Sequence, residues 1–257
     1  MAEGTQSFDR AVGLLDIVSK NNRDGVAFSE LLDTTRLTRP TARRLLMALA
    51  EHGFIEQDAS NKRYFLGPKV YDLALLVLPS FDFREIYQPS LNRLVEDTGD
   101  TVFLNRVVSD DIVCIARESG SFPVKAFILD VGVQRPIGIG AGGLAVLSEM
   151  DAAKANALLR RNAERIAAHG GDTGVAARLV DEARERGYVA RDGSGLGTRT
   201  IAMALHDSTG KPFASLSVST IRDRMQGDHL ESVVSALREE VAAIREKLSR
   251  LRPQHTG

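Results

Sequence analysis

The first third of the chain carries apolar side chains at helical spacing, and three short helices are predicted there. Ser7 is expected to cap the first helix, Ser29 the second and Thr38 the third. In the third helix Pro40 lies in the first turn, where no intrahelical N–H is needed, and Gly53 follows the last turn. The apolar face of the first helix consists of Phe8, Ala11, Leu14, Leu15 and Val18.

A hairpin is predicted after these helices. The segments Phe54–Gln57 and Arg63–Leu66 are expected to be strands, because they are rich in apolar and aromatic side chains and flank a polar loop. A Gly-Pro pair closes this unit. Three helices and a hairpin are the elements of a winged helix-turn-helix domain, which we place at residues 1–68.

A strongly apolar helix is predicted next, from Val70 to Leu78, with its end at Pro79 and Ser80. Because it is apolar around most of its circumference, it needs packing partners on several sides. We therefore interpret residues 69–80 as a linker helix that also packs against a second subunit, and we place the larger domain at residues 81–257.

Strand-like runs alternate with turns and helices in the larger domain. An amphipathic helix that ends at Thr98 and Gly99 opens it, and a capping box of Asp228 and Glu231 begins its last helix. The predicted strands are 101–108, 111–117, 124–130, 188–190, 200–206 and 213–220, and the predicted helices between them are 142–150, 152–168 and 174–186. The fold class expected from this order is α+β, with the last two strands paired antiparallel.

The composition is that of a packed protein, with 43% hydrophobic and 26% charged residues. No segment approaches the ~20 apolar residues that cross a bilayer. The apolar stretch 11–18 is interrupted by Asp16 and lacks a cleavage site, so we expect neither a signal peptide nor a membrane partner. The single cysteine, Cys114, cannot form an intramolecular disulfide or a cysteine-based zinc site. We therefore expect a cytoplasmic protein with an inert core thiol.

Any nucleic-acid role requires a local basic surface, because the formal net charge of the whole chain is −1. Between Thr34 and Ala50 there are four arginines and no acid. A solvated helix face would explain the arginines alone. The combination of short helix, turn, capped basic helix and basic-tipped hairpin instead favours a recognition helix with a wing. The residues predicted to contact DNA are Arg36, Arg39, Thr41, Arg43, Arg44, Lys62 and Arg63.

Several segments, taken in order, resemble the IclR family of transcriptional regulators. They are FDRAV (8–12), LTRPTARRLL (37–46), YFLGP (64–68), GVQRPI (132–137), GAG (140–142), RGY (186–188) and SLSVS (215–219). Each motif alone is weak, but their order and spacing are specific and extend over nearly the whole chain. The resemblance implies a C-terminal GAF-like α/β effector-binding domain with a mostly antiparallel sheet. It also implies a homodimer or homotetramer on pseudo-palindromic, double-stranded operator DNA.

A glycine-rich segment, Gly138–Gly143, precedes a predicted apolar helix and matches the pattern G-x-G-x-x-G. A dinucleotide fingerprint is disfavoured, because no clean βαβ unit surrounds the segment and no ribose-binding acid follows at the expected distance. Two interpretations remain open. The glycines permit a tight strand-to-helix turn, or they form a seat for an anion at the N-terminus of the helix.

The resemblance supports the anion seat, since IclR-type regulators bind their effector in this region. It implies backbone N–H groups at the glycine-rich turn, hydroxyls from neighbouring strands and an acid from a nearby loop. The implied effector-binding residues are Gly140, Ala141, Asp192, Thr200, Ser217 and Ser219. Candidates for the apolar wall, or simply for the core, are Phe103, Cys114, Phe127, Leu129 and Ile137. The loop Gly193–Gly197 lacks the lysine of a P-loop, which favours a lid or a plain loop.

Sequence motifs of common enzymes are missing. The five histidines form no H-x-x-x-H or H-E-x-x-H pair, and no serine lies in G-x-S-x-G. We therefore expect a regulator rather than an enzyme, with no cofactor and no metal. The resemblance implies a small organic acid as effector, often aromatic or derived from a sugar, and we favour repression over activation. The remaining alternative, a constitutive architectural DNA binder, would leave most of the chain without a purpose.

Overall fold

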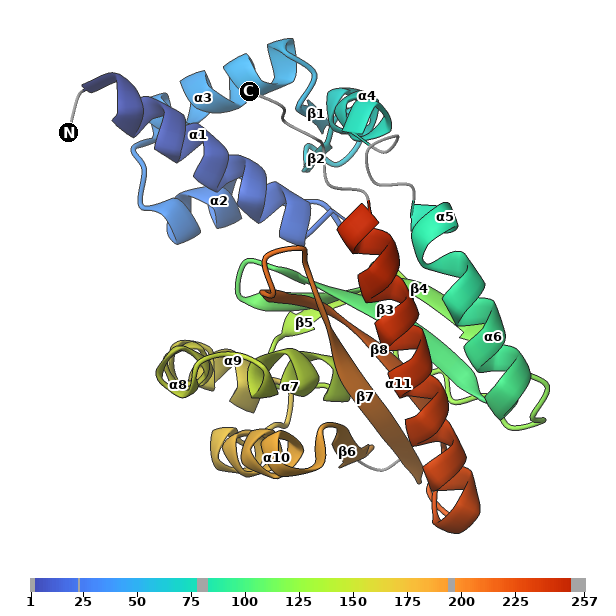
Figure 1. Cartoon of the computed structure of the whole chain (residues 1–257). Coiled ribbons are helices and arrows are strands. Elements are labelled where there is room, and N and C mark those ends of the chain that lie inside the picture. The colour runs from blue at the N-terminus through green and yellow to red at the C-terminus, as the bar shows by residue number, and fades with distance from the viewer. Residues whose placement is uncertain (1–2, 23, 78–82, 194–196, 251–257) are drawn as a thin grey trace, which may run out of the picture. The chain divides into compact units, whose positions relative to one another are not determined.

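The computed structural model describes residues 3–22, 24–77, 83–193 and 197–250 (Figure 1). The chain divides into two compact units, Met1–Asp82 and Phe83–Gly257, and each is described by itself. None of the helices within these ranges has both the length and the apolar character that crossing a lipid bilayer requires. The predicted domain limits at 68 and 80 remain a prediction, and Leu78, Pro79 and Ser80 lie outside the described residues.

Helices and a short hairpin build the N-terminal unit. In chain order its elements are α1 (Glu3–Lys20), α2 (Phe28–Thr35), α3 (Arg39–Glu51), β1 (Ile55–Gln57), β2 (Tyr64–Leu66) and α4 (Pro68–Val77). The two strands pair antiparallel, with Ile55 opposite Leu66, and Val26 adds an isolated bridge to Tyr64. The small core consists of Leu14, Val18, Val26, Leu31, Leu45, Leu46 and Ile55. The predicted helix-turn-helix with a hairpin is confirmed.

Two of the three predicted helix starts in this unit are wrong. The first helix begins at Glu3, before Ser7. The second begins at Phe28 rather than after Ser29, because the Glu30 carboxylate accepts the backbone N–H of Ala27 at 2.9 Å. Thr38 does occupy the N-cap position of α3, but its hydroxyl contacts the Thr41 hydroxyl instead of a backbone N–H.

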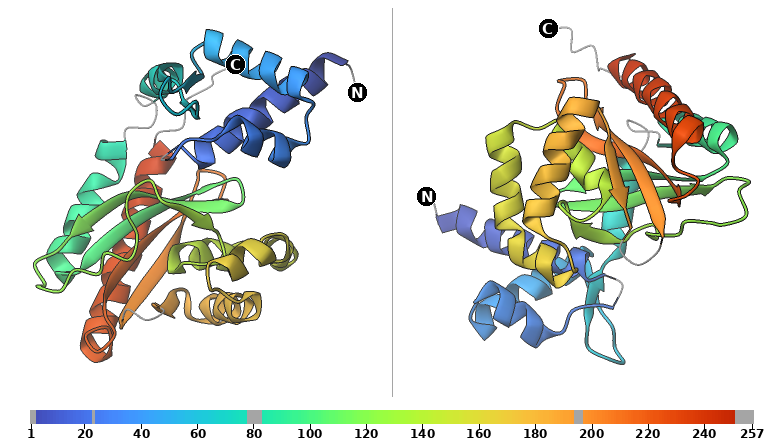
Figure 2. Two further views of the ribbon diagram at one scale, coloured as in Figure 1. Left: turned by 180° about the vertical axis from the view of Figure 1, so that it is seen from behind. Right: turned by 90° about the horizontal axis from the view of Figure 1, so that it is seen from below.

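A six-stranded antiparallel sheet forms the centre of the larger unit, in the order β5-β4-β3-β8-β7-β6. Its strands are β3 (Thr101–Val108), β4 (Asp111–Ser119), β5 (Gln134–Pro136), β6 (Val189–Asp192), β7 (Thr198–His206) and β8 (Pro212–Ile221). One face is covered by α5 (Phe83–Ile86), α6 (Gln88–Thr98) and α11 (Gly227–Arg250). The other carries α7 (Ala141–Ser148), α8 (Ala152–Arg161), α9 (Ala163–Ala168) and α10 (Thr173–Arg186) (Figure 2).

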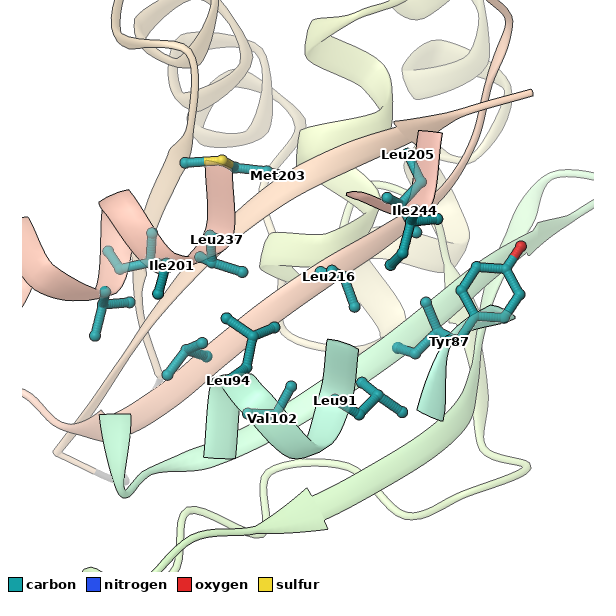
Figure 3. Close-up of a cluster of buried hydrophobic side chains, with 14 of the residues drawn as sticks. Tyr87, Leu91, Leu94, Val102, Ile201, Met203, Leu205, Leu216, Leu237 and Ile244 are labelled. Carbon is teal, nitrogen blue, oxygen red and sulfur yellow. The ribbon is translucent and has the colours of Figure 1, made fainter. Parts of the chain in front are cut away.

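Serine alternates with apolar residues in β8, so the two kinds of side chain point to opposite faces of the sheet. Leu216 and Val218 belong to the apolar cluster that also contains Leu94 of α6 and Leu237 of α11 (Figure 3). Successive side chains in a strand point to opposite faces, so the serines at 215, 217 and 219 face the α7 side. One strand therefore contributes apolar side chains to the core on one side and buried hydroxyl groups on the other.

The predicted strand at 124–130 is not formed. That segment has no strand structure, and Phe127 within it is 56% exposed. Its place beside β4 is taken by β5, in which Arg135 lies opposite Ile112. Two helices also differ from the prediction: the predicted helix 152–168 is broken at Asn162, and the last helix begins at Gly227.

Candidate nucleic-acid interface and ligand pocket

The exposed face of α3 is basic. Ala42, Leu45 and Leu46 are buried, whereas Arg39, Arg43 and Arg44 are exposed. The three arginines line a shallow hollow together with Phe28, Pro40, Met47, Ala48 and Glu51. Among the described residues their guanidinium groups have neither a hydrogen bond nor an ion pair. Their charges are therefore available to an external anion.

Phe28 lies beneath two of these arginines. The guanidinium carbon of Arg39 is 5.6 Å from the centre of its ring, and that of Arg43 is 5.9 Å away. Cations at such distances are attracted by the aromatic quadrupole. The ring therefore holds two like charges side by side on the surface, an arrangement that an external phosphate would stabilise.

Two further predicted contact residues flank α3. Arg36 is the C-cap of α2, with a left-handed φ of 55° and its backbone N–H bonded to the Leu32 carbonyl at 2.9 Å. Its side chain is exposed. Thr41 is half-buried and its hydroxyl contacts that of Thr38 at 2.9 Å. No side chain caps the first turn of α3, so its N–H groups remain suited to an anion.

The hairpin tip is ordered by Asp58. Its carboxylate accepts the backbone N–H groups of Ser60 and Asn61. Hydrogen bonds from the Ser60 hydroxyl and from these amides hold the pKa of Asp58 below its ordinary value. Lys62 follows with a left-handed φ of 59° and an exposed side chain. Its ammonium makes no hydrogen bond or ion pair within the described part of the chain.

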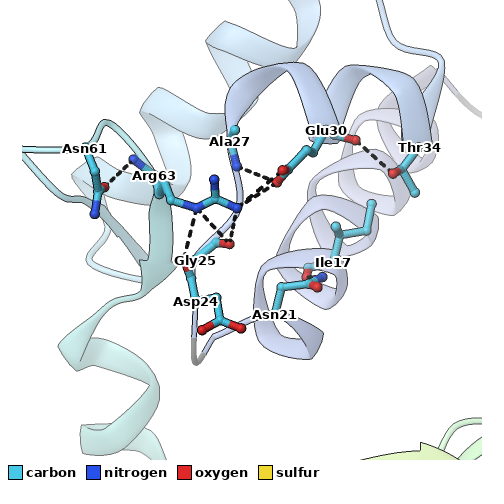
Figure 4. Close-up of polar contacts among 9 residues, drawn as sticks. All are labelled: Ile17, Asn21, Asp24, Gly25, Ala27, Glu30, Thr34, Asn61 and Arg63. Carbon is cyan, nitrogen blue, oxygen red and sulfur yellow. Dashed lines mark hydrogen bonds and ion pairs between the residues drawn. The ribbon is translucent and has the colours of Figure 1, made fainter.

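Arg63, which was predicted to contact DNA, forms hydrogen bonds within the N-terminal unit. Its guanidinium donates to the backbone carbonyls of Asp24 and Gly25 at 2.9 and 3.0 Å, and it pairs with Glu30 at 3.1 Å (Figure 4). These bonds tie the hairpin to the loop that precedes α2. Since Nε and Nη2 of this guanidinium are already bound within the N-terminal unit, we leave Arg63 out of the DNA contacts proposed below.

A cavity of about 310 Å³ lies within the larger unit, at the N-terminus of α7. It is lined by Gly140, Ala141, Asp192, Thr200 and Ser217, five of the six residues implied by the family resemblance. Thr200 and Ser217 reach it from neighbouring strands β7 and β8. Ser219 is fully buried and does not line the cavity, but its hydroxyl accepts a hydrogen bond from that of Thr200 at 2.9 Å. Ser219 can therefore orient the Thr200 hydroxyl.

Asp192 borders the cavity, but its carboxylate is bound elsewhere. It accepts a hydrogen bond from Arg199 at 2.6 Å and lies 3.8 Å from Arg222. The Arg199 hydrogen bond is the main reason that the pKa of Asp192 lies below its ordinary value. In the β6–β7 ladder Asp192 is opposite Arg199, and Arg191 is opposite Thr200. The side chain beside the Thr200 hydroxyl is therefore that of Arg191.

Sequence reasoning missed two arginines of this cavity. Arg135 and Arg191 both line it, although neither was among the predicted effector-binding residues. Strand alternation was the available signal for Arg191, because residues that face each other across a ladder share one side of the sheet. Arg135 lies in a three-residue strand that the sequence did not predict.

The apolar candidates divide between the cavity and the core. Phe103 and Leu129 line the cavity. Cys114 and Ile137 are fully buried outside it, and the cavity wall is completed instead by Ile112, Ile128 and Ile139. Phe127 is exposed and its ring lies 4.2 Å from the guanidinium carbon of Arg117.

Cys114 is expected to resist thiol reagents in the native protein. Burial raises the pKa of its thiol to about 11, so about one molecule in a thousand carries a thiolate at pH 8. Labelling with a chromogenic disulfide at pH 8 should be slow in buffer and complete in urea. Rapid stoichiometric labelling of the folded chain would show that the thiol is not enclosed.

The described residues offer no cluster of three or more histidine, cysteine, aspartate or glutamate side chains that could hold a metal ion. The glycine loop at 193–197 lies largely outside the described residues, since Ser194, Gly195 and Leu196 are not described.

Comparisons with protein families give two matches that together cover most of the chain. The model described as "Bacterial transcriptional regulator IclR C-terminal" matches residues 75–246, and the "IclR helix-turn-helix domain" matches residues 7–59. The acetate operon repressor of Salmonella typhimurium is 27% identical over 243 residues, which cover 88% of this chain and 83% of that protein. The regulator BhcR of Paracoccus denitrificans is 26% identical, with coverages of 92% and 86%.

Solved structures share the fold. An IclR transcriptional regulator from Silicibacter sp. superposes with a TM-score of 0.81 at 23% identity, covering 95% of this chain and 96% of the other. An IclR homolog from Microbacterium hydrocarbonoxydans, solved in complex with 4-hydroxybenzoate, gives a TM-score of 0.65 at 21% identity, with coverages of 95% and 99%.

Proposed function

Because this chain belongs to the IclR family of bacterial transcriptional regulators, we propose that it is a repressor released from its operator by a small organic acid. Members of this family are DNA-binding regulators and not enzymes. Several of the similar curated proteins are named repressors, which supports repression over activation.

The observation that carries the proposal is the row of exposed arginines on α3 with no hydrogen bond or ion pair among the described residues. A recognition helix places such donors in the major groove while its other face packs on the core. In this proposal Arg43 reads a base edge, and Arg39, Arg44 and Lys62 contact phosphates. Arg36, which precedes α3, and Thr41, in its first turn, belong to the same proposed DNA-binding surface.

We further propose that two copies of the chain act together. Two recognition helices related by a twofold axis would read the two halves of a pseudo-palindrome, and dimers could also pair into tetramers. The segment 69–80 would link the DNA-binding domain at 1–68 to the effector domain at 81–257. An acid that binds one arrangement of the domains more tightly shifts the population toward it by that difference in affinity.

The cavity at the start of α7 supports an acidic effector. Gly140 is the N-cap of this helix and has no side chain to cap it, so the first N–H groups can receive a carboxylate. Hydroxyls of Thr200 and Ser217 line the same cavity. A related structure carries 4-hydroxybenzoate, a small aromatic acid, which makes aromatic acids reasonable first candidates.

A mobility-shift assay with the full chain tests the proposal. DNA from upstream of its own gene should be retarded in the presence of excess random duplex, and binding should weaken steeply with salt because phosphate contacts release counterions. Adding organic acids should release the DNA. Equal affinity for specific and random duplex would contradict a sequence-specific regulator, and a specific complex that no acid alters would contradict the sensor.

A further inference from the structure

The cavity at the start of α7 holds two positive charges that the protein does not neutralise. Arg135 and Arg191 both line it. Neither guanidinium has a hydrogen bond or an ion pair within the residues that the structure describes. The acidic side chain among the described lining residues is Asp192, and its carboxylate is bound by Arg199 and lies close to Arg222. The cavity therefore presents net positive charge to whatever enters it.

The two arginines come from opposite edges of the sheet. Arg135 is in β5 and Arg191 is in β6, and these are the first and last strands in the sheet order. Both nevertheless line one cavity, so the sheet curls around it. Because both residues line one cavity, their guanidinium charges repel each other, and burial together with the charge of Arg135 lowers the pKa of Arg191. A bound anion would relieve this repulsion.

The remaining walls provide a second, separate place for an acidic group. The uncapped N-terminus of α7 at Gly140 can receive one carboxylate without using either arginine. Between these positions the cavity has a polar floor. Asn105 is 5% exposed and lines the cavity, and its buried carboxamide oxygen has no hydrogen-bond partner among the described residues. Thr200 and Ser217 lie on the same wall.

We infer that the effector carries two acidic groups, one received at the N-terminus of α7 and the other by Arg135 and Arg191 together. The ligand class is a small dicarboxylic acid, since the cavity of about 310 Å³ is at the lower end of the sizes found for ligand pockets. This inference rests on the proposed function as an acid sensor and adds the number of charges that the sensor requires. Guanidinium groups suit the task, because they bind carboxylates in a bidentate manner.

Matched pairs of acids that differ in one charge provide the test. Benzoate, 3-carbamoylbenzoate and isophthalate share a ring and one carboxylate, and only isophthalate adds a second. Pentanoate and glutarate form the equivalent aliphatic pair. Binding to the full chain is measured by calorimetry, and release of operator DNA by mobility shift. We expect at least one diacid to bind about tenfold or more tightly than its monoacid or amide counterpart.

Two variants assign this preference to the arginines. Arg191→Gln and Arg135→Gln should each weaken diacid binding about tenfold or more and leave monoacid binding nearly unchanged. Their melting temperatures without ligand should equal or exceed that of the parent chain, because the repulsion between the two arginines is relieved. If an arginine served only to stabilise the fold, its replacement would lower the melting temperature. Arg178→Gln, which removes an exposed arginine of α10 outside the cavity, is the matched control.

The outcomes separate the two proposals. Monoacids that bind as tightly as their diacid counterparts, or variants at 135 and 191 that leave diacid binding unchanged, overturn the requirement for two charges while the acid sensor stands. If no acid of either kind binds the chain or releases operator DNA, both the sensor and this inference fail.

Discussion

A methyl group on Gly143 is expected to destabilise the larger unit by about 3 kcal/mol, a large effect for one carbon atom. Gly143 lies in the first turn of α7, where an added Cβ would meet the backbone carbonyl oxygen of Ile137 well inside van der Waals contact. Backbone atoms cannot rotate away as a side-chain end can, so α7 must move. In Gly143→Ala the melting temperature of this unit should fall by about 6–12 °C.

Gly140→Ala is the matched control, because it adds the same atom three residues before Gly143, at the N-cap position just outside α7. A Cβ at Gly140 meets no atom within 4 Å, and the φ of −100° suits any L-residue. We expect its melting temperature to remain close to that of the parent chain. Equal melting temperatures for Gly143→Ala and Gly140→Ala would show that the close approach of α7 to Ile137 is not required.

The larger Gly140→Val links the same position to effector binding. Its two methyl groups should obstruct the place proposed for a carboxylate at the start of α7, so release of DNA by acids should be lost. Operator binding without acid should persist, because α3 belongs to the other unit. A Gly140→Val variant that responds fully to acids would remove Gly140 from the effector site.

Local sequence signals predicted the parts of the fold that local interactions determine. The basic helix α3 was expected from an N-cap threonine, a proline in the first turn and a terminal glycine, and Thr38, Pro40 and Gly53 occupy those places. The burial of Ala42, Leu45 and Leu46 follows from helical spacing alone. The strands β3, β7 and β8 were also found, because their apolar residues alternate or run continuously over many positions.

The features that the sequence did not predict depend on contacts between residues far apart in the chain. The segment 124–130 has strand-forming residues, yet the neighbouring place in the sheet is taken by the short strand β5. Whether Arg63 faces solvent or the protein depends on the carbonyls of Asp24 and Gly25, far away in sequence. Likewise, the register of β6 against β7 decides that Arg191 rather than Asp192 lies beside Thr200. A one-residue difference in register exchanges the two faces of a strand, and with them the charge of the pocket.

Replacing Arg43 by alanine is expected to lower the preference for operator over random DNA by about 1–3 kcal/mol per half-site, because a bidentate contact to a base edge would be lost. Competition between operator and random duplex at fixed salt measures this ratio.

The comparison variant is Lys62→Asn, since asparagine tolerates the left-handed backbone at this position and removes the charge. It should weaken binding to all sequences alike and reduce the slope of log affinity against log salt by about one, as expected for one lost phosphate contact. The two variants thus separate base reading by α3 from phosphate binding by the hairpin. Equal losses on operator and random DNA in Arg43→Ala would contradict a base contact, and the reading of sequence would then have to be assigned to Arg39 or Arg44.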